Sequence, residues 1–249
     1  MSVYIGSARS DERGKLSGGA AGDQTGKEVS YQTWYKHSKG WVVLRAKDKK
    51  VQQRLAYAMK AACDNNKIGY DQGNRNGLYN TVKNKGFDPT KCTANTETDC
   101  SALVRVCVSY AANIKVSDFN TASELSVLKN LGIFNVLTDT KYTTKADNLL
   151  PGDILVTKTK GHTVIVISND KVVTIEIAKY TLRKGNKGSE VRKLQQNLND
   201  AIGAGLVVDG DFGIKTFEAL KAFQSKYGLV VDGIYGKNSY NKMKEVLGL

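Results

Sequence analysis

The sequence predicts a mixed α+β domain over residues 1–180, followed by a small all-α domain of three helices over residues 182–249. Strand-like and helical patterns alternate up to about residue 177, whereas only the helical spacing of apolar residues recurs beyond residue 182. Of the 249 residues 41% are hydrophobic and only 2 are proline, which is typical of a folded globular chain. The length is sufficient for two modest domains with buried cores.

The first domain is expected to open with a Gly-rich surface loop at residues 18–27, followed by a strand at residues 41–44. Apolar residues at helical spacing predict a helix over residues 49–64, and further helices begin near Cys100 and near Ala122. Three strands are predicted to close the domain, at residues 153–157, 162–167 and 171–177.

Helical spacing in the second domain predicts helices over residues 189–198, 215–227 and 238–247. Two turns between them repeat one another, because residues 208–216 match residues 231–239. Each copy has glycines where a turn needs positive φ, and an aromatic residue that can fill the core. A Thr or Ser at the end of each copy can cap the next helix.

The chain carries 37 basic and 24 acidic side chains, a net charge of +13 that favours a polyanionic partner. No apolar run approaches the roughly 18–20 residues of a membrane span, so membrane insertion is not expected. No zinc-finger or aromatic RNA-binding motif accompanies the charge, which argues against a nucleic-acid partner. No secretory signal is recognisable, so synthesis in the cytoplasm is expected.

Cysteine and histidine usage limits the chemistry. The four cysteines include no C-x-x-C pair, and the two histidines, His37 and His162, lie far apart in the sequence. A catalytic zinc site usually takes two or three imidazoles, so no metal is expected, and nothing in the sequence indicates another cofactor. The remaining option for histidine chemistry is one cysteine that acts with one histidine.

Cys100 is the cysteine best placed to be a nucleophile. Polar residues 98–101 lead directly into an apolar helical repeat, which puts Cys100 near a helix N-terminus. There the exposed N–H groups and the helix dipole favour the thiolate. Cys63 and Cys107 are expected in helix cores, and Cys92 in a polar loop.

His162 is the better placed of the two histidines. It follows a turn and opens an apolar strand, a position that can hold a general base rigidly. His37 lies in a polar stretch and is expected to be solvated. Cys100 and His162 are therefore the candidate catalytic pair.

Four segments of the first domain carry a family resemblance. Residues 68–70 (Ile-Gly-Tyr), 99–104 (Asp-Cys-Ser-Ala-Leu-Val), 150–156 (Leu-Pro-Gly-Asp-Ile-Leu-Val) and 161–166 (Gly-His-Thr-Val-Ile-Val) resemble, in this order, the motifs of NlpC/P60 cysteine peptidases. CHAP amidases share the same papain-like plan and are a close alternative. The resemblance implies a papain-like fold in which Cys100 attacks a peptide or amide carbonyl and His162 is the base. It also places three residues at the substrate cleft or oxyanion site, namely Tyr70, Asp99 and Ser101.

The third catalytic residue departs from the family pattern, because many NlpC/P60 enzymes have a second His on the return strand and this chain has none. If residues 168–170 form a three-residue loop, Glu176 lies directly opposite His162 and can fix its tautomer, as a Glu often does in CHAP enzymes. A two-residue loop turns Glu176 to the other face. Thr174, on the same face as Glu176, is the alternative.

Residues 182–249 resemble the peptidoglycan-binding domain type 1. Residues 182–198, the two Val-Asp-Gly-x-(Phe/Tyr)-Gly repeats and residues 222–229 match marks of that family in order. The resemblance implies that the repeats bind the cell wall. The residues concerned are Asp209, Gly210, Phe212, Asp232, Gly233 and Tyr235.

Together the two resemblances imply an endolysin of a bacteriophage or prophage with a Gram-positive host, which hydrolyses peptidoglycan and reaches the wall with the help of a holin. Endopeptidase activity is preferred over N-acetylmuramoyl-L-alanine amidase activity. The alternative is a catalytically inactive wall-binding or structural protein. Anionic wall polymers are further expected partners, because residues 182–249 carry a net +4 and leave +9 on the first domain.

Overall fold

The computed structural model describes residues 2–159, 161–169 and 177–247. The chain divides into two compact units, Met1–Val172 and Val173–Leu249. The first unit combines strands and helices and the second contains helices, as the sequence predicts.

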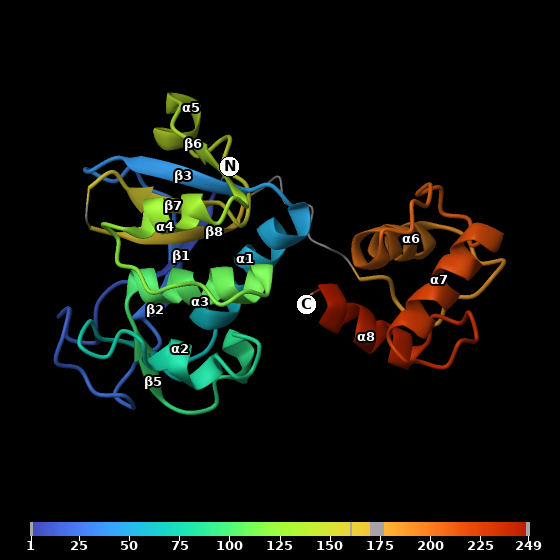
Figure 1. The fold of residues 1–249 in the computed structure, drawn as a ribbon, viewed down its shortest axis with the longest axis horizontal. Coiled ribbons are helices and arrows are strands. Elements are labelled where there is room, and N and C mark those ends of the chain that lie inside the picture. The colour runs from blue at the N-terminus through green and yellow to red at the C-terminus, as the bar shows by residue number, and fades with distance from the viewer. Residues whose placement is uncertain (1, 160, 170–176, 248–249) are drawn as a thin grey trace. The chain divides into compact units, whose positions relative to one another are not determined.

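An antiparallel sheet of six strands forms the centre of the first unit, with the strand order β2-β1-β8-β7-β3-β6 (Figure 1). The strands are β1 (Tyr4–Ala8), β2 (Val29–Thr33), β3 (Trp41–Ala46), β6 (Phe134–Leu137), β7 (Ile154–Thr157) and β8 (Thr163–Ser168). A separate parallel pair consists of β4 (Ile68–Tyr70) and β5 (Thr96–Thr98), and β5 ends just before the helix that begins at Cys100.

Two long helices, α1 (Lys49–Cys63) and α3 (Cys100–Ala112), pack against each other and against one face of the sheet (Figure 1). Their apolar side chains join those of β8 in one core. A smaller core covers the opposite face, around the fully buried Trp41. The shorter elements are α2 (Gly77–Val82), the 3-10 turn η1 (Pro89–Lys91), α4 (Glu124–Asn130) and α5 (Thr140–Thr143).

Most of the predicted elements of the first unit are confirmed. The helix predicted over residues 49–64 is α1, and the helices expected near Cys100 and Ala122 are α3 and α4. The strands predicted at residues 41–44, 153–157 and 162–167 are β3, β7 and β8, within two residues at each end. Strands β1 and β2 were not predicted, and they change the neighbours of β8.

The predicted return strand at residues 171–177 has no free place beside β8. One edge of β8 pairs with β7, where Val156 lies opposite Thr163, and the other pairs with β1, where Gly6 lies opposite Ile165. Ile177 is not in a strand and packs against the helical core of the second unit. The hairpin argument that set Glu176 opposite His162 is therefore wrong; residues 171–176 themselves lie outside the described residues.

The second unit contains the three predicted helices, α6 (Ser189–Ile202), α7 (Ile214–Lys226) and α8 (Lys237–Leu247). They surround a core in which Leu194, Leu198 and Leu220 are fully buried. The loops that contain the two sequence repeats connect α6 to α7 and α7 to α8.

Candidate active site

Cys100 is the first residue of α3, as predicted, and only 7% of its surface is exposed. β5 ends at Thr98, and Asp99 then caps the helix: its carboxylate accepts a hydrogen bond from the backbone N–H of Ala102 at 2.6 Å. The backbone is extended at Asp99 and helical from Cys100 onward, so the cap fixes the place of the thiol.

Arg75 stabilises the start of α3 through several contacts. Its guanidinium donates to Asp99 at 2.8 Å and to the hydroxyl of Ser101 at 3.1 Å, and it also forms an ion pair with Asp118. Ser101 in turn donates to Asp99. Asp99 and Ser101 are predicted at the substrate cleft, but both side chains are buried. Their hydrogen bonds hold the helix start that carries Cys100.

The sulfur of Cys100 lies beside the first residue of β8. The backbone N–H groups of Thr163 and Ser101 are close enough to favour the thiolate. Burial outweighs them, and with the nearby carboxyl groups of Asp99 and Glu124 it raises the pKa of the thiol to about 12. The N–H groups at the helix start thus favour the thiolate, as expected, but burial has the larger effect and keeps the pKa of the thiol high.

Glu124 is a site residue that the sequence analysis missed. It lies in the first turn of α4, has no exposed surface, and accepts a hydrogen bond from the hydroxyl of Thr163 at 2.7 Å. Its second carboxyl oxygen, Oε2, is buried and has no partner among the described residues. Burial raises the pKa of Glu124 to about 8, so this carboxyl is mostly protonated at pH 7.

His162 is held by its main chain at the start of β8. Its N–H donates to the hydroxyl of Thr157, and its carbonyl accepts from the N–H of the same residue, both at 3.0 Å. Burial, and then the charges of His37 and Arg9, lower the pKa of His162 to about 4. The imidazole is therefore neutral at pH 7, the form a general base needs.

Cys100 and His162 are thus brought to the same place through Thr163. No hydrogen bond joins the thiol to the imidazole among the described contacts. Catalytic hydrogen bonds are often long in the absence of substrate and tighten in its complex. The sulfur of Cys100 therefore lies beside the residue that directly follows a partly buried His162.

His37 is not solvated, in contrast to the expectation from its polar neighbours. It is half-buried and packs edge-on against Trp41, with 5.1 Å between the ring centroids, and burial lowers its pKa. Tyr35 contacts both rings, and burial raises the pKa of its hydroxyl, with smaller influences from the nearby Arg9 and Cys100. These groups add an aromatic surface beside His162.

Tyr70, the other predicted cleft residue, ends β4 and is 3% exposed. Its hydroxyl accepts a hydrogen bond from the amide of Gln72 at 3.1 Å. Burial raises the pKa of Tyr70 to about 12, and the nearby Cys100 acts in the same direction. Tyr70 is thus a neutral hydroxyl near the sulfur. Glu176 and Thr174, the predicted third residues, lie outside the described residues.

In the second unit the predicted wall-binding residues prove to build the two repeated loops. Gln195 donates to Asp209 at 2.8 Å and accepts from the N–H of Gly210. Gln224 repeats these contacts in the second loop, with Asp232 at 2.8 Å and with the N–H of Gly233. The repeat in the sequence is therefore a repeat of one loop structure.

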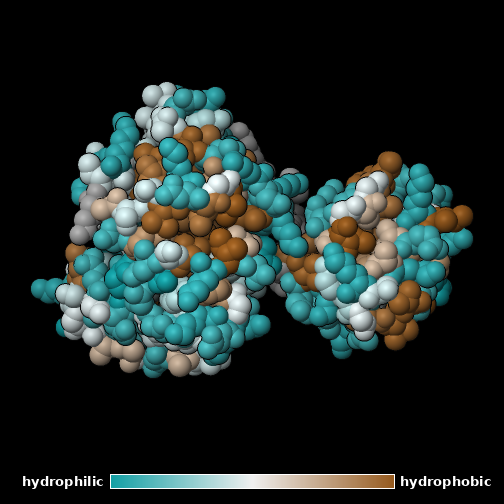
Figure 2. Space-filling view, in the orientation of Figure 1, coloured by the Kyte–Doolittle hydropathy of each residue, from teal (hydrophilic) through white to brown (hydrophobic). Residues whose placement is uncertain are grey.

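The aromatic residues of the repeats, Phe212 and Tyr235, are fully buried in the core. They cannot form a binding surface in this structure, which corrects that part of the expectation. Hydrophobic side chains do lie on the surface of the unit (Figure 2). The most exposed are Val207 and Val230, at equivalent positions of the two repeats, and Ile214.

The first unit matches a known protein family. The model of the family described as "Endolysin-like domain" matches residues 5–173, more than half of the chain. The chain belongs to the endolysin-like domain family. A second model, described as "Putative peptidoglycan binding domain", matches residues 187–243. Together the two matches indicate a cell-wall-associated, endolysin-like protein with peptidoglycan as its partner.

Two solved structures are similar to part of the chain. The SleB N-terminal domain is 32% identical over 29% of this chain and 99% of its own, with a TM-score of 0.28. A peptidoglycan-binding protein from Clostridioides difficile, solved with glutamine hydroxamate, is 28% identical over 38% of this chain and 72% of its own, also with a TM-score of 0.28. No curated protein matches the chain.

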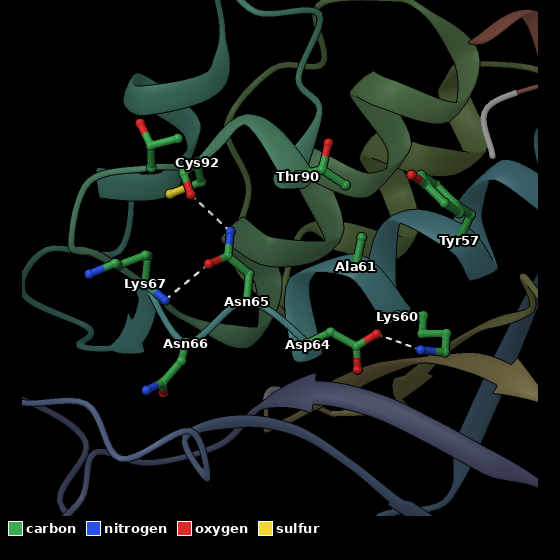
Figure 3. Close-up of a pocket in the computed structure, with 10 residues that line it drawn as sticks. Tyr57, Lys60, Ala61, Asp64, Asn65, Asn66, Lys67, Thr90 and Cys92 are labelled. Atoms are coloured by element: carbon green, nitrogen blue, oxygen red, sulfur yellow. Dashed lines mark hydrogen bonds and ion pairs between the residues drawn. The ribbon is translucent and has the colours of Figure 1, made fainter. Parts of the chain in front are cut away.

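A pocket in the endolysin-like domain lies away from Cys100. It measures about 740 Å³ and lies at the C-terminal end of α1, between Tyr57, Lys67 and Cys92 (Figure 3). Asn65 donates to the carbonyl of Cys92 at 2.9 Å and joins the two walls. Neither Cys100 nor His162 lines this pocket.

Among the described residues, no set of three or more His, Cys, Asp or Glu side chains is arranged to hold a metal ion. The same part of the chain contains no helix with the length and apolar character needed to cross a membrane.

Proposed function

We propose that the endolysin-like domain hydrolyses an amide or peptide bond of peptidoglycan, with Cys100 as the nucleophile and His162 as the base. The observation that carries this proposal is the contact between the sulfur of Cys100 and the backbone of Thr163, the residue directly after His162. The second unit, which matches a peptidoglycan-binding family, keeps the enzyme on the wall.

The protonation states determine how the thiol attacks. With thiol and imidazole both neutral, no thiolate–imidazolium pair exists before substrate binds. As the sulfur bonds to the carbonyl carbon, the thiol proton passes to the imidazole, as it does from serine to histidine in a serine hydrolase. The imidazolium then gives this proton to the leaving amine, and a thioester on Cys100 remains.

Water completes the reaction. The neutral imidazole of His162 accepts a proton from the attacking water, the carbon–sulfur bond breaks, and the proton returns to the sulfur. The released product carries a carboxyl group. In this proposal the backbone N–H of Ser101, beside the sulfur, and the nearby hydroxyl of Tyr70 stabilise the negative charge that develops on the carbonyl oxygen.

Glu124 acts as a positioning residue in this proposal. Its carboxyl accepts a hydrogen bond from the hydroxyl of Thr163, and the backbone N–H of Thr163 lies beside the sulfur of Cys100. Burial raises the pKa of the Glu124 carboxyl to about 8, and its protonated form carries less negative charge beside the nucleophile than a carboxylate would. Glu124 is therefore our candidate for the third polar residue, in place of Glu176.

Of the two bond types, we propose a bond within the stem peptide rather than the muramoyl-L-alanine amide, because the ordered motifs resemble NlpC/P60 enzymes. Mass spectrometry of the muropeptides released from purified walls distinguishes the two. New peptide termini within the stem support the endopeptidase, whereas stems released whole from the glycan show an amidase.

A wall-binding protein without catalytic activity is the second candidate. The buried thiol favours it, because a pKa of about 12 leaves almost no thiolate at neutral pH. In this case the endolysin-like domain contributes binding alone.

The Cys100→Ala variant separates the two candidates. We expect it to lose at least about 100-fold in the rate of muropeptide release from purified walls, while it still pellets with them. Cys107→Ala is the matched control, since Cys107 is a buried residue of the same helix and faces the apolar core. Release at the wild-type rate by Cys100→Ala contradicts a cysteine mechanism.

A further inference from the structure

Arg9 lies directly beside the candidate catalytic pair. β1 ends at Ala8, and Gly6 lies opposite Ile165 on β8. Continuing this antiparallel register puts Arg9 opposite His162, with both side chains on the same face. The hydroxyl of Ser7 donates to the carbonyl of Thr163 at 2.9 Å and holds the strands together at this end.

The guanidinium of Arg9 is half-buried and incompletely paired. One nitrogen, Nη2, donates to the carbonyl of Ser30 at 3.1 Å. Its Nε is buried and has no hydrogen-bond partner, and no acidic side chain of the described residues forms an ion pair with it. Arg45 and Arg75, which are buried to a similar degree, each have a carboxylate at 2.6–2.8 Å.

An unpaired charge of this kind is costly to keep. A half-buried cation without a counter-ion loses hydration, and here the carbonyl of Ser30 replaces only part of it. The positive charge of Arg9 helps to lower the pKa of His162. It also acts on the pKa of Tyr35, which Cys100 influences as well. An anion that bound here would thus lie within the same group of residues as the nucleophile and the base.

We propose that Arg9 binds a free carboxylate of the substrate, so that the site selects peptidoglycan stem peptides that carry a carboxylate close to the bond that is cut. A guanidinium matches the planar geometry of a carboxylate and can donate two parallel hydrogen bonds to it. This inference deepens the proposed function, because it names the chemical class that the same site prefers.

The position of Arg9 assigns it to a substrate group rather than to the reacting oxygen. The oxygen of the attacked carbonyl develops its charge beside the sulfur, at the N-terminus of α3. Arg9 projects from the opposite side, across from His162, where it meets a neighbouring group of the peptide. It is therefore a specificity-determining residue and not part of the proton transfer.

Binding can be measured without hydrolysis. The full-length Cys100→Ala protein is titrated calorimetrically with a synthetic stem peptide that has free carboxylates, and with the same peptide in which the carboxylates are carboxamides. Arg9→Gln and Arg9→Lys are added to the Cys100→Ala background. Arg13→Gln is the matched control, because Arg13 is exposed and already paired with Asp11.

We expect the free acid to bind about tenfold or more tightly than the carboxamide, and Arg9→Gln to remove this preference. Arg9→Lys, which keeps the charge but not the planar fork, is expected to retain part of it, and Arg13→Gln all of it. Equal binding of the two peptides by the protein with Arg9 intact overturns the proposal without any Arg9 variant. A preference that persists in a folded Arg9→Gln protein does so as well.

The result is distinguishable from a failure of the proposed function. If Cys100→Ala releases muropeptides as fast as the wild type, the cysteine mechanism fails, yet the two peptide titrations still decide whether Arg9 selects a carboxylate. If the preference is absent while Cys100→Ala is inactive, the hydrolase stands and the carboxylate assignment is wrong.

Discussion

Burial gives Glu124 and His162 opposite dependences of stability on pH. The pKa of Glu124 is raised from an ordinary value near 4.5 to about 8, so its contribution is complete at low pH and is lost as the pH rises through about 8. The pKa of His162 is lowered from 6.5 to about 4, so its contribution is complete above pH 6.5 and is lost as the pH falls through about 4. The two effects oppose each other between about pH 4.5 and 6.5.

Above pH 6.5 only Glu124 of these two residues makes the stability depend on pH, and the Glu124→Gln variant isolates this effect. We expect the free energy of unfolding of the wild type to fall by about 2 kcal/mol between pH 6.5 and pH 8.5, because the folded state keeps a proton that the unfolded state has lost. Glutamine imitates the protonated carboxyl and can still accept from Thr163. Urea unfolding at both pH values should show a nearly constant free energy for this variant.

The pH 6.5 measurement is the control, since wild type and Glu124→Gln are expected to be close in stability there. A parallel decline of both proteins toward pH 8.5 shows that other groups are responsible, and that Glu124 is not buried in its protonated form.

The sequence pattern indicates the candidate pair Cys100 and His162 but not the residues around it. Cys100 was recognisable because polar residues give way to an apolar helix at that point, and His162 because it opens a buried strand. Glu124 was not, because an acidic residue in the first turn of a helix is ordinarily a solvated one. Its burial depends on Thr163, which lies 39 residues away in the sequence.

At the scale of elements, the turn before β7 shows that a motif can be structural. Gly152 has a φ of +87°, and a Cβ there would lie 1.8 Å from the carbonyl oxygen of Gln52. Asp153, next to it, is fully buried and pairs with Arg45 at 2.6 Å, while Gln52 donates to the same carboxylate. The segment 150–156 that resembles a family motif thus joins β7 to β3 and α1.

Gly152→Ala tests this role against a matched glycine. Gly86 has a similar φ of +69°, but a Cβ there meets nothing within 4 Å. We expect Gly86→Ala to cost about 1 kcal/mol of stability, from the left-handed backbone alone, and Gly152→Ala at least about 3 kcal/mol, because it adds a backbone collision. Chemical denaturation of both variants measures the difference, and equal losses contradict the close packing.

Helices and strands whose residues show a clear pattern within a short stretch of sequence can be predicted. Strands that are defined by pairing with a segment far away in the sequence cannot. α3 has a cap and an apolar repeat within a few residues, so its start at Cys100 can be read from the sequence. β1 is only five residues long, contains Gly6, and is defined by pairing with β8 some 160 residues later. Without β1, the sequence leaves one edge of β8 open for a return strand, and the prediction that Glu176 lies opposite His162 depends on that open edge.

At the scale of the whole molecule, the net charge of +13 predicts attraction to an anionic wall. Because added salt shortens the Debye length from about 10 Å at 0.1 M to about 3 Å at 1 M, we expect muropeptide release to slow several-fold over this range. Turbidity assays on intact walls measure it. Walls stripped of anionic polymers should give a weaker salt dependence, and an equal dependence shows that these polymers do not attract the protein.

If Cys100 is the nucleophile, it becomes covalently acylated during wall cleavage. Peptide mapping by mass spectrometry detects this directly in protein that is acid-quenched while it degrades purified walls. We expect a thioester-linked peptidoglycan fragment on the peptide that contains Cys100, and we expect both this fragment and muropeptide release to be absent in Cys100→Ala. Continued release by Cys100→Ala, with no adduct on the wild type, would contradict it.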